Sequence, residues 1–196
     1  MAAKEIKMYS DYKSPFAYLA FEPGIDLERH YDVTVRWIPF QLRIKGKGER
    51  SLYSEYKTRY SYLDARRWAK LRGLVIRSQL KVYDTRTALI GGLFAQRHSQ
   101  LRAFNLKVYE LFWKRELLPD DADQVAAVVA NMGLSAAQYH EYLAGEGAAD
   151  YERAQNEAAA DHIFGVPIFV FENEPFWGYD RLPVLEQRLT EAGLKL

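Results

Sequence analysis

The chain has 196 residues, of which 48% are hydrophobic and 14% aromatic, so it can bury a substantial core. Its 27 Lys and Arg residues nearly balance its 26 Asp and Glu residues. The chain therefore has no large net positive charge that would attract nucleic acid or an anionic membrane. It has no cysteine, which excludes disulfides, thiolate metal sites and a dithiol redox cycle of its own.

The N-terminal sequence MAAKEIKMYSD reaches charged residues at once and lacks the apolar centre of a secretion signal. No uninterrupted run of about 18 apolar residues follows it. We therefore expect a cytoplasmic, soluble protein.

The first third of the chain predicts a strand, a helix and a second strand. Residues 5–10 (EIKMYS) alternate apolar and polar side chains, as a strand does. Ser14 is a favourable helix N-cap, and Pro15 suits the first helical position because its missing N–H needs no acceptor there. This helix is expected to end near Phe21, before Pro23 and Gly24. Alternation resumes over residues 32–40 (DVTVRWIPF), which predicts a parallel strand reached by a right-handed crossover.

The middle of the chain predicts helices. A basic, glycine-containing loop leads into residues 53–143, which have helical periodicity and hardly any strand signal. Start and stop signals divide this block into segments at 55–73, 85–99, 101–117, 120–133 and 135–143. We expect an all-helical insertion over residues 43–148.

The last quarter returns to sheet. Residues 150–164 predict an alanine-rich helix, residues 165–173 (GVPIFVFEN) a short apolar strand, and residues 175–193 a small strand and a closing helix. The order is βαβ, then helices, then αββα. It predicts an α/β fold with a thioredoxin-like sheet in a discontinuous domain, residues 1–42 and 149–196.

The stretch Ser14-Pro15-Phe16-Ala17 has the form of a C-P-x-C redox turn without its cysteines. A hydroxyl at a helix N-terminus lies in the positive end of the helix dipole and can help to hold an anion, including a thiolate brought by a cofactor. Ser14 can equally be an ordinary N-cap.

Pro167 opens the apolar strand, where it cannot donate a backbone hydrogen bond. A cis Val166–Pro167 bond facing a ligand would explain its presence, and a trans proline at a strand start is the simpler alternative. Base rates favour the trans form from this pattern alone.

Tyr179 and Asp180 lie at a strand-to-helix junction. Asp180 could accept from a ligand amine, while backbone N–H groups at the helix start could hold a carboxylate. The alternative is a capped helix with a surface pair between Asp180 and Arg181.

Other motifs are absent. The four histidines have neither H-x-x-x-H nor H-E-x-x-H spacing, so no metal site is expected. The chain also lacks G-x-S-x-G, Walker A and G-x-G-x-x-G sequences, which argues against serine hydrolases and nucleotide-binding proteins.

A family resemblance rests on three features in chain order. They are residues 11–19 (DYKSPFAYL), the helical middle of the chain, and residues 165–182 (GVPIFVFENEPFWGYDRL). The chain resembles the 2-hydroxychromene-2-carboxylate isomerases, relatives of kappa-class glutathione transferases within the DsbA-like thioredoxin superfamily. The resemblance covers nearly the whole chain. It implies that serine replaces the first redox cysteine and that glutathione supplies the missing sulfur. It also implies that Pro167 corresponds to the cis-proline of the superfamily, so we predict a cis Val166–Pro167 bond.

The resemblance also implies a set of site residues. Ser14 would be catalytic and would bind the thiolate, and the backbone of Val166 would pair with the cysteinyl part of glutathione. Lys57, in the family pattern K-x-x-Y-x-x-x-D (KTRYSYLD here), would contact the cofactor, and Asp180 would bind its γ-glutamyl end. The cofactor-binding set is Ser14, Pro15, Phe16, Lys57, Val166, Pro167, Tyr179 and Asp180. An asparagine expected about nine residues before the lysine has no counterpart in residues 46–56 (GKGERSLYSEY).

The implied activity is a glutathione-dependent isomerisation of a conjugated aromatic or chromene-type carboxylic acid, in aromatic compound catabolism. The enzyme would mainly lower the pKa of the thiol and align the acceptor. The alternatives are a kappa-type glutathione transferase or peroxidase, and a redox-inactive DsbA-like binding protein. A homodimer is implied, with a small-molecule aromatic acid as substrate.

Overall fold

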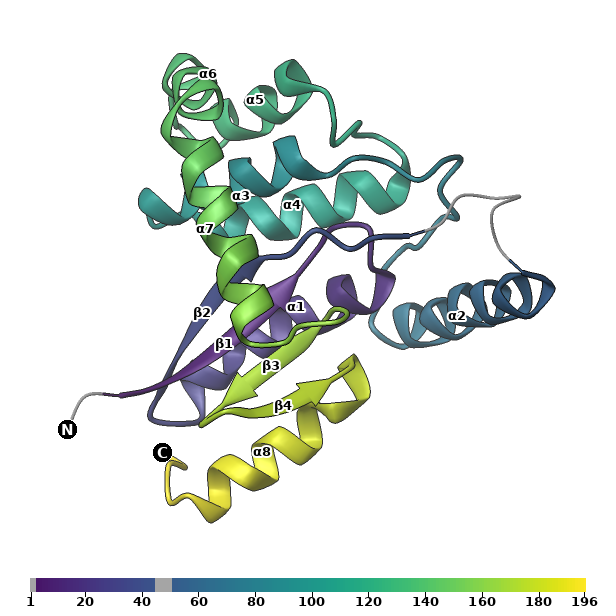
Figure 1. The fold of residues 1–196 in the computed structure, drawn as a ribbon, viewed down its shortest axis with the longest axis vertical. Coiled ribbons are helices and arrows are strands. Elements are labelled where there is room, and N and C mark those ends of the chain that lie inside the picture. Colours follow the sequence, from purple (N-terminus) through teal and green to yellow (C-terminus); the bar gives the residue numbers. More distant parts are fainter. Residues whose placement is uncertain (1–2, 45–50) are drawn as a thin grey trace.

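A four-stranded mixed sheet organises the chain in the computed structural model, which describes residues 3–44 and 51–196 (Figure 1). The strand order is β2-β1-β3-β4. β1 runs parallel to β2 and antiparallel to β3, which pairs antiparallel with β4. The bounds are β1 (Lys4–Ser10), β2 (Val33–Pro39), β3 (Ile168–Phe171) and β4 (Glu174–Trp177). The predicted order of elements and the α/β thioredoxin-like fold are confirmed.

Alternate residues of β1 face two separate cores. Ile6 and Met8 belong to the larger core, which also contains buried residues of α1 (Pro15–Ile25). Tyr9 faces the other side and packs with Ala154 and Ala158 of α7 (Glu146–Ala160). This strand periodicity places α1 and α7 on opposite faces of the sheet.

The helix α1 continues beyond the predicted end near Phe21, so that prediction is wrong. Pro23 inside it cannot donate to the carbonyl of Leu19, four residues earlier. Arg72, at the C-terminus of α2 (Leu52–Leu71), donates to this carbonyl instead and pairs with Glu22 at 3.2 Å. A contact between distant segments thus offsets the lost helical hydrogen bond.

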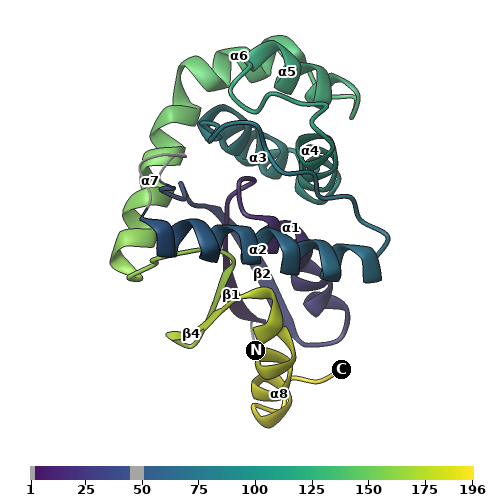
Figure 2. The same ribbon diagram turned by 90° about the vertical axis from the view of Figure 1, so that its right-hand side faces the viewer.

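Four helices gather beyond one end of the sheet, while α2 packs beside α1 (Figures 1 and 2). The four are α3 (Arg86–Arg97), α4 (Leu101–Lys114), α5 (Ala122–Ala130) and α6 (Ala136–Ala144). The chain closes with α8 (Leu182–Glu191). None of the helices within the described ranges is long and apolar enough to cross a membrane. The division into a sheet domain and an insertion over residues 43–148 stays a prediction.

A network of charged side chains joins α7 to the sheet. Glu157 of α7 accepts from Arg36 of β2 at 3.0 Å, and its carboxylate lies 3.0 Å from Lys7 of β1. Asp161 accepts from Lys7 at 2.7 Å and from Tyr9 at 2.6 Å. The hydrogen bonds from Arg36, with help from Lys7, lower the pKa of Glu157 to about 2.

This lowered pKa predicts an acid-dependent loss of stability. A carboxyl group whose pKa is lower in the folded state stabilises the fold above its unfolded pKa of about 4.3, and the stabilisation is lost as the pH falls toward its folded pKa. We expect the difference in unfolding free energy between wild type and Glu157→Gln to shrink between about pH 6 and pH 2 in urea titrations. A constant difference would contradict this assignment.

Candidate active site

Ser14 connects the end of β1 to the N-terminus of α1. It is 4% exposed, and its Oγ accepts from the backbone N–H of Ala17 at 3.1 Å, so Ser14 is the N-cap as predicted. The same hydroxyl donates to the carbonyl oxygen of Val166 at 3.1 Å. Ser14 therefore joins the helix start to a segment 152 residues away in sequence.

The Val166–Pro167 peptide bond is cis, as predicted. Both residues are buried, and the carbonyl of Pro167 accepts from the backbone N–H of Gly178 at 2.9 Å. The cis-proline segment, directly before β3, thus lies against Ser14.

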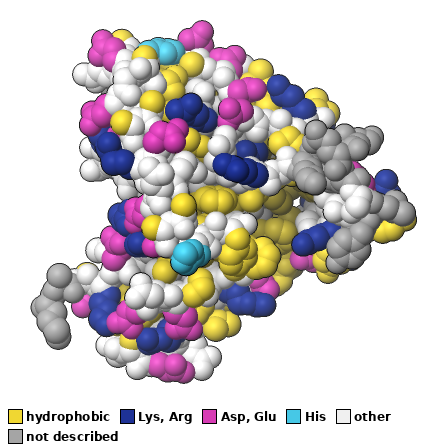
Figure 3. Space-filling model, viewed as in Figure 1, with side chains coloured by type: hydrophobic (Ala, Val, Ile, Leu, Met, Phe, Trp, Pro, Cys, Tyr) yellow, Lys and Arg dark blue, Asp and Glu magenta, His cyan; other side chains and the backbone are white. Residues whose placement is uncertain are grey.

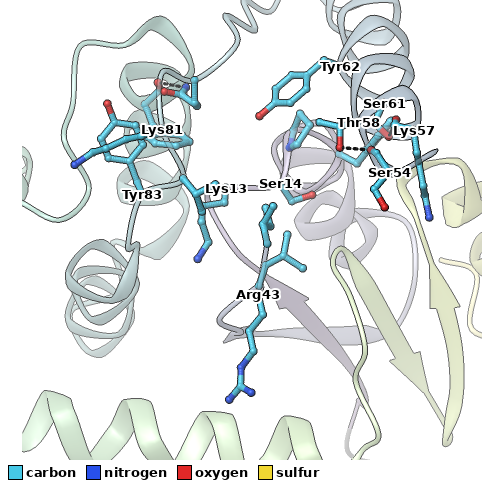
Figure 4. A pocket seen from close by; sticks show the side chains of 17 residues that line it. Lys13, Ser14, Arg43, Ser54, Lys57, Thr58, Ser61, Tyr62, Lys81 and Tyr83 are labelled. Atoms are coloured by element: carbon cyan, nitrogen blue, oxygen red, sulfur yellow. Dashed lines mark hydrogen bonds between the residues drawn. The ribbon is translucent and has the colours of Figure 1, made fainter. Parts of the chain in front are cut away.

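A cavity of about 500 Å³ opens beside Ser14 (Figure 4). Its lining comes from the start of α1, the segment after β2, α2, the segment before α3, and Phe112 of α4. Ser54, Lys57, Thr58 and Ser61 of α2 lie on one side of Ser14 in the view, and Lys81 and Tyr83 on the other. Of the predicted site residues, the cavity brings together Ser14, Pro15, Phe16 and Lys57.

The cavity combines positive charge with apolar walls. Among the described residues that line it there are four cations and no Asp or Glu, the cations being Lys13, Arg43, Lys57 and Lys81. Its apolar and aromatic walls include Phe16, Leu42, Tyr62, Val82, Tyr83 and Phe112. On the face shown in Figure 3, apolar side chains gather in the hollow between the helices above and the sheet below, with Lys and Arg around them. This lining suits an aromatic molecule that carries negative charge.

Asp11 is a buried residue at the site that the sequence analysis did not single out. It is fully buried, and Thr85 and the backbone N–H of Lys13 donate to its Oδ1 at 2.7 and 3.0 Å. The backbone N–H of Leu42 donates to its Oδ2 at 2.7 Å, and the ammonium of Lys13 lies 3.3 Å from the same oxygen. Burial raises the pKa of the Asp11 carboxyl, while Lys13 and these hydrogen bonds oppose the rise. In the sequence, the position of Asp11 directly after the first predicted strand could have identified it as a candidate site residue.

Tyr179 and Asp180 do not line the cavity. The Tyr179 ring packs on Trp68 of α2, with 5.4 Å between ring centroids, and Arg72 lies over it. Asp180 is exposed and accepts from Arg181 at 2.8 Å, which is the surface pair considered as its alternative. Tyr179 therefore helps to hold α2 in place, and a cofactor role for these two residues stays a prediction.

The segment that lacks the family asparagine lies partly outside the described residues. That asparagine would stand about nine residues before Lys57, within residues 46–56, of which residues 46–50 are not described. The effect of that sequence departure on the site stays a prediction.

Comparisons with known proteins agree with this architecture. Residues 5–190 match the family model of the DSBA-like thioredoxin domain. A 2-hydroxychromene-2-carboxylate isomerase from Pseudomonas putida is 29% identical over 192 residues, covering 94% of this chain and 93% of the relative.

Solved structures agree as well. A 2-hydroxychromene-2-carboxylate isomerase structure superposes with a TM-score of 0.81 at 25% identity, covering 96% of this chain and 95% of that one. A probable DsbA oxidoreductase from Streptomyces coelicolor has a TM-score of 0.80 at 18% identity, covering 96% and 89%. The second match reflects the fold alone. The resemblance inferred from the sequence is confirmed, and the chain belongs to the DsbA-like thioredoxin-domain family.

Proposed function

We propose that this chain is a glutathione-dependent isomerase that acts on a conjugated aromatic or chromene-type carboxylic acid by reversible thiolate addition. The observation that carries the proposal is the buried Ser14 hydroxyl, held between a helix N-terminus and the cis-proline segment beside a cationic, aromatic cavity. The near full-length similarity to proteins named 2-hydroxychromene-2-carboxylate isomerase supports the reaction class.

The residues present fit a thiol tripeptide. In the first turn of α1, Pro15 has no N–H and the N–H of Ala17 donates to Ser14, which leaves the N–H of Phe16 without a helical acceptor. The helix dipole favours an anion there. Ser14 adds a hydroxyl at this point, Lys57 offers a cation for a carboxylate, and the backbone of Val166 offers peptide groups beside Pro167. When bound, glutathione would supply the sulfur nucleophile that a chain without cysteine lacks, and would be regenerated as it leaves the acceptor.

Ser14 has one proton to give. In the structure this proton is donated to the Val166 carbonyl. To stabilise a thiolate, the hydroxyl must rotate away from that carbonyl and donate to the sulfur, while its oxygen continues to accept from Ala17. Ser14 and the helix terminus together would then favour the ionised thiol at neutral pH.

The remaining cavity residues would hold the acceptor. Phe16, Tyr62 and Phe112 form apolar walls for a planar ring, and the lining cations favour its carboxylate. Fixing the acceptor next to Ser14 converts a bimolecular encounter into a reaction within one complex.

A calorimetric titration combined with product analysis tests the proposal. We expect reduced glutathione and S-methylglutathione to bind, and a conjugated ring-opened aromatic acid to isomerise without consuming glutathione. Loss of one glutathione per turnover would instead identify a transferase. Failure of both glutathione and S-methylglutathione to bind would contradict the proposed cofactor.

Lys57 provides a separate test of the cofactor site. We expect Lys57→Met to weaken S-methylglutathione binding about three- to tenfold, because one exposed charge-assisted contact is lost. Lys70→Met, on the same helix but outside the cavity lining, is the matched control and should bind as the wild type does. Equal affinities in all three proteins would remove Lys57 from the site.

A further inference from the structure

Lys13 differs from the other three cations that line the cavity. It is 8% exposed, whereas Arg43, Lys57 and Lys81 are exposed. A buried lysine is rare without a partner, and here the partner is the fully buried Asp11, 3.3 Å from the ammonium. The position of this charge is therefore defined by the fold.

The carboxylate of Asp11 is itself held in place. It accepts from Thr85 and from two backbone N–H groups, those of Lys13 and Leu42. The Lys13 ammonium lies 3.3 Å from Asp11 Oδ2, and its three N–H donors allow it to bind a ligand in the cavity as well. Because the ammonium is shielded from water, its attraction for an anion is stronger than that of an exposed cation.

Lys13 directly precedes Ser14, and both residues line the same cavity. An anionic group bound at Lys13 therefore shares this cavity with the proposed thiolate position. Lys81 is less suited, because it is exposed, pairs with Asp120 at 3.4 Å and packs over the Tyr83 ring. Lys57 belongs to the proposed cofactor site.

We propose that Lys13, positioned by Asp11, binds the carboxylate of the acceptor and makes the site selective for planar conjugated acids over their neutral analogues. The inference rests on the proposed function for the nature of the acceptor. It assigns Lys13 as a specificity-determining residue and Asp11 as its positioning residue.

Calorimetry with trans-cinnamate and the uncharged trans-cinnamamide tests this assignment without turnover. We expect the wild type to prefer cinnamate, and Lys13→Met to weaken cinnamate binding about ten- to a hundredfold, as loss of a charged hydrogen bond does. Binding of cinnamamide and S-methylglutathione should stay unchanged. Lys81→Met is the matched control and should weaken cinnamate binding less than about threefold, as an exposed charge pair does.

Lys13→Met leaves Asp11 buried without its cation, so the double variant Asp11→Asn/Lys13→Met keeps the test valid if the single variant fails to fold. The double variant should also lose the preference for cinnamate. Retained preference in either variant, or an equal loss in Lys81→Met, would overturn the inference. If S-methylglutathione does not bind but Lys13 still governs the preference, the cofactor proposal fails and this inference stands.

Discussion

Replacing Ser14 with alanine is expected to lower kcat about ten- to a thousandfold, as removal of one donor to a developing or stabilised anion does. The variant loses the only side-chain hydroxyl that lies between the N-terminus of α1 and the cis-proline segment in the described structure. The thiol of bound glutathione should also ionise at a higher pH, which the thiolate absorbance near 240 nm measures.

The same substitution removes an N-cap, which costs about 1 kcal/mol of stability. Ser135→Ala is the matched control, because Ser135 caps α6 through Gln138 at 3.3 Å and lies outside the cavity lining. It should lose a similar unfolding free energy in urea and keep full turnover. Comparable turnover in the Ser14→Ala variant and the wild type would show that Ser14 is only a helix cap.

Replacing Asp11 with alanine is expected to lower the unfolding free energy by about 3–5 kcal/mol, the cost of removing one partner of a buried ion pair. The substitution leaves the Lys13 ammonium without its carboxylate, and Thr85 and the Leu42 N–H without their acceptor. Chemical denaturation followed by tryptophan fluorescence measures the loss.

Asp11→Asn separates charge from hydrogen bonding. Its amide oxygen can still accept from Thr85, and burial disfavours the ionised carboxyl in the wild type, so we expect a smaller loss than with alanine. A loss below about 1 kcal/mol in Asp11→Ala would show that Lys13 is stabilised by solvent in the cavity rather than by Asp11.

Much of the fold could be predicted because its signals are local. Alternation of apolar and polar side chains in residues 5–10 and 32–40 predicted β1 and β2. Helical periodicity predicted the helices that lie between β2 and β3 in the chain. Ser14 and Pro15 matched the positions that a helix start prefers. The position of Pro167 at a buried strand start left the cis and trans forms open, and the family resemblance predicted the cis peptide bond that the structure has.

Local rules failed where a distant segment changes the energy. The Pro-Gly pair predicted the end of α1, yet Arg72 supplies a donor for the carbonyl that Pro23 leaves free. At Gly24, a Cβ would lie 2.7 Å from the Phe169 ring, so this glycine permits close packing on the sheet rather than ending the helix. Both effects depend on residues far away in the sequence.

The sequence by itself determined the absence of thiol chemistry in this chain, the order of its elements and the helix cap at Ser14. The family resemblance implied that Ser14, Lys57 and Val166 share one site. Only the tertiary structure decided their contacts: Ser14 donates to Val166, Lys57 lines the cavity, and Tyr179 and Asp180 lie outside its lining. It also decided the partners of Asp11, which come from three separate segments. Caps and periodicity act over about four residues, whereas a site depends on how whole elements pack, which no local pattern specifies.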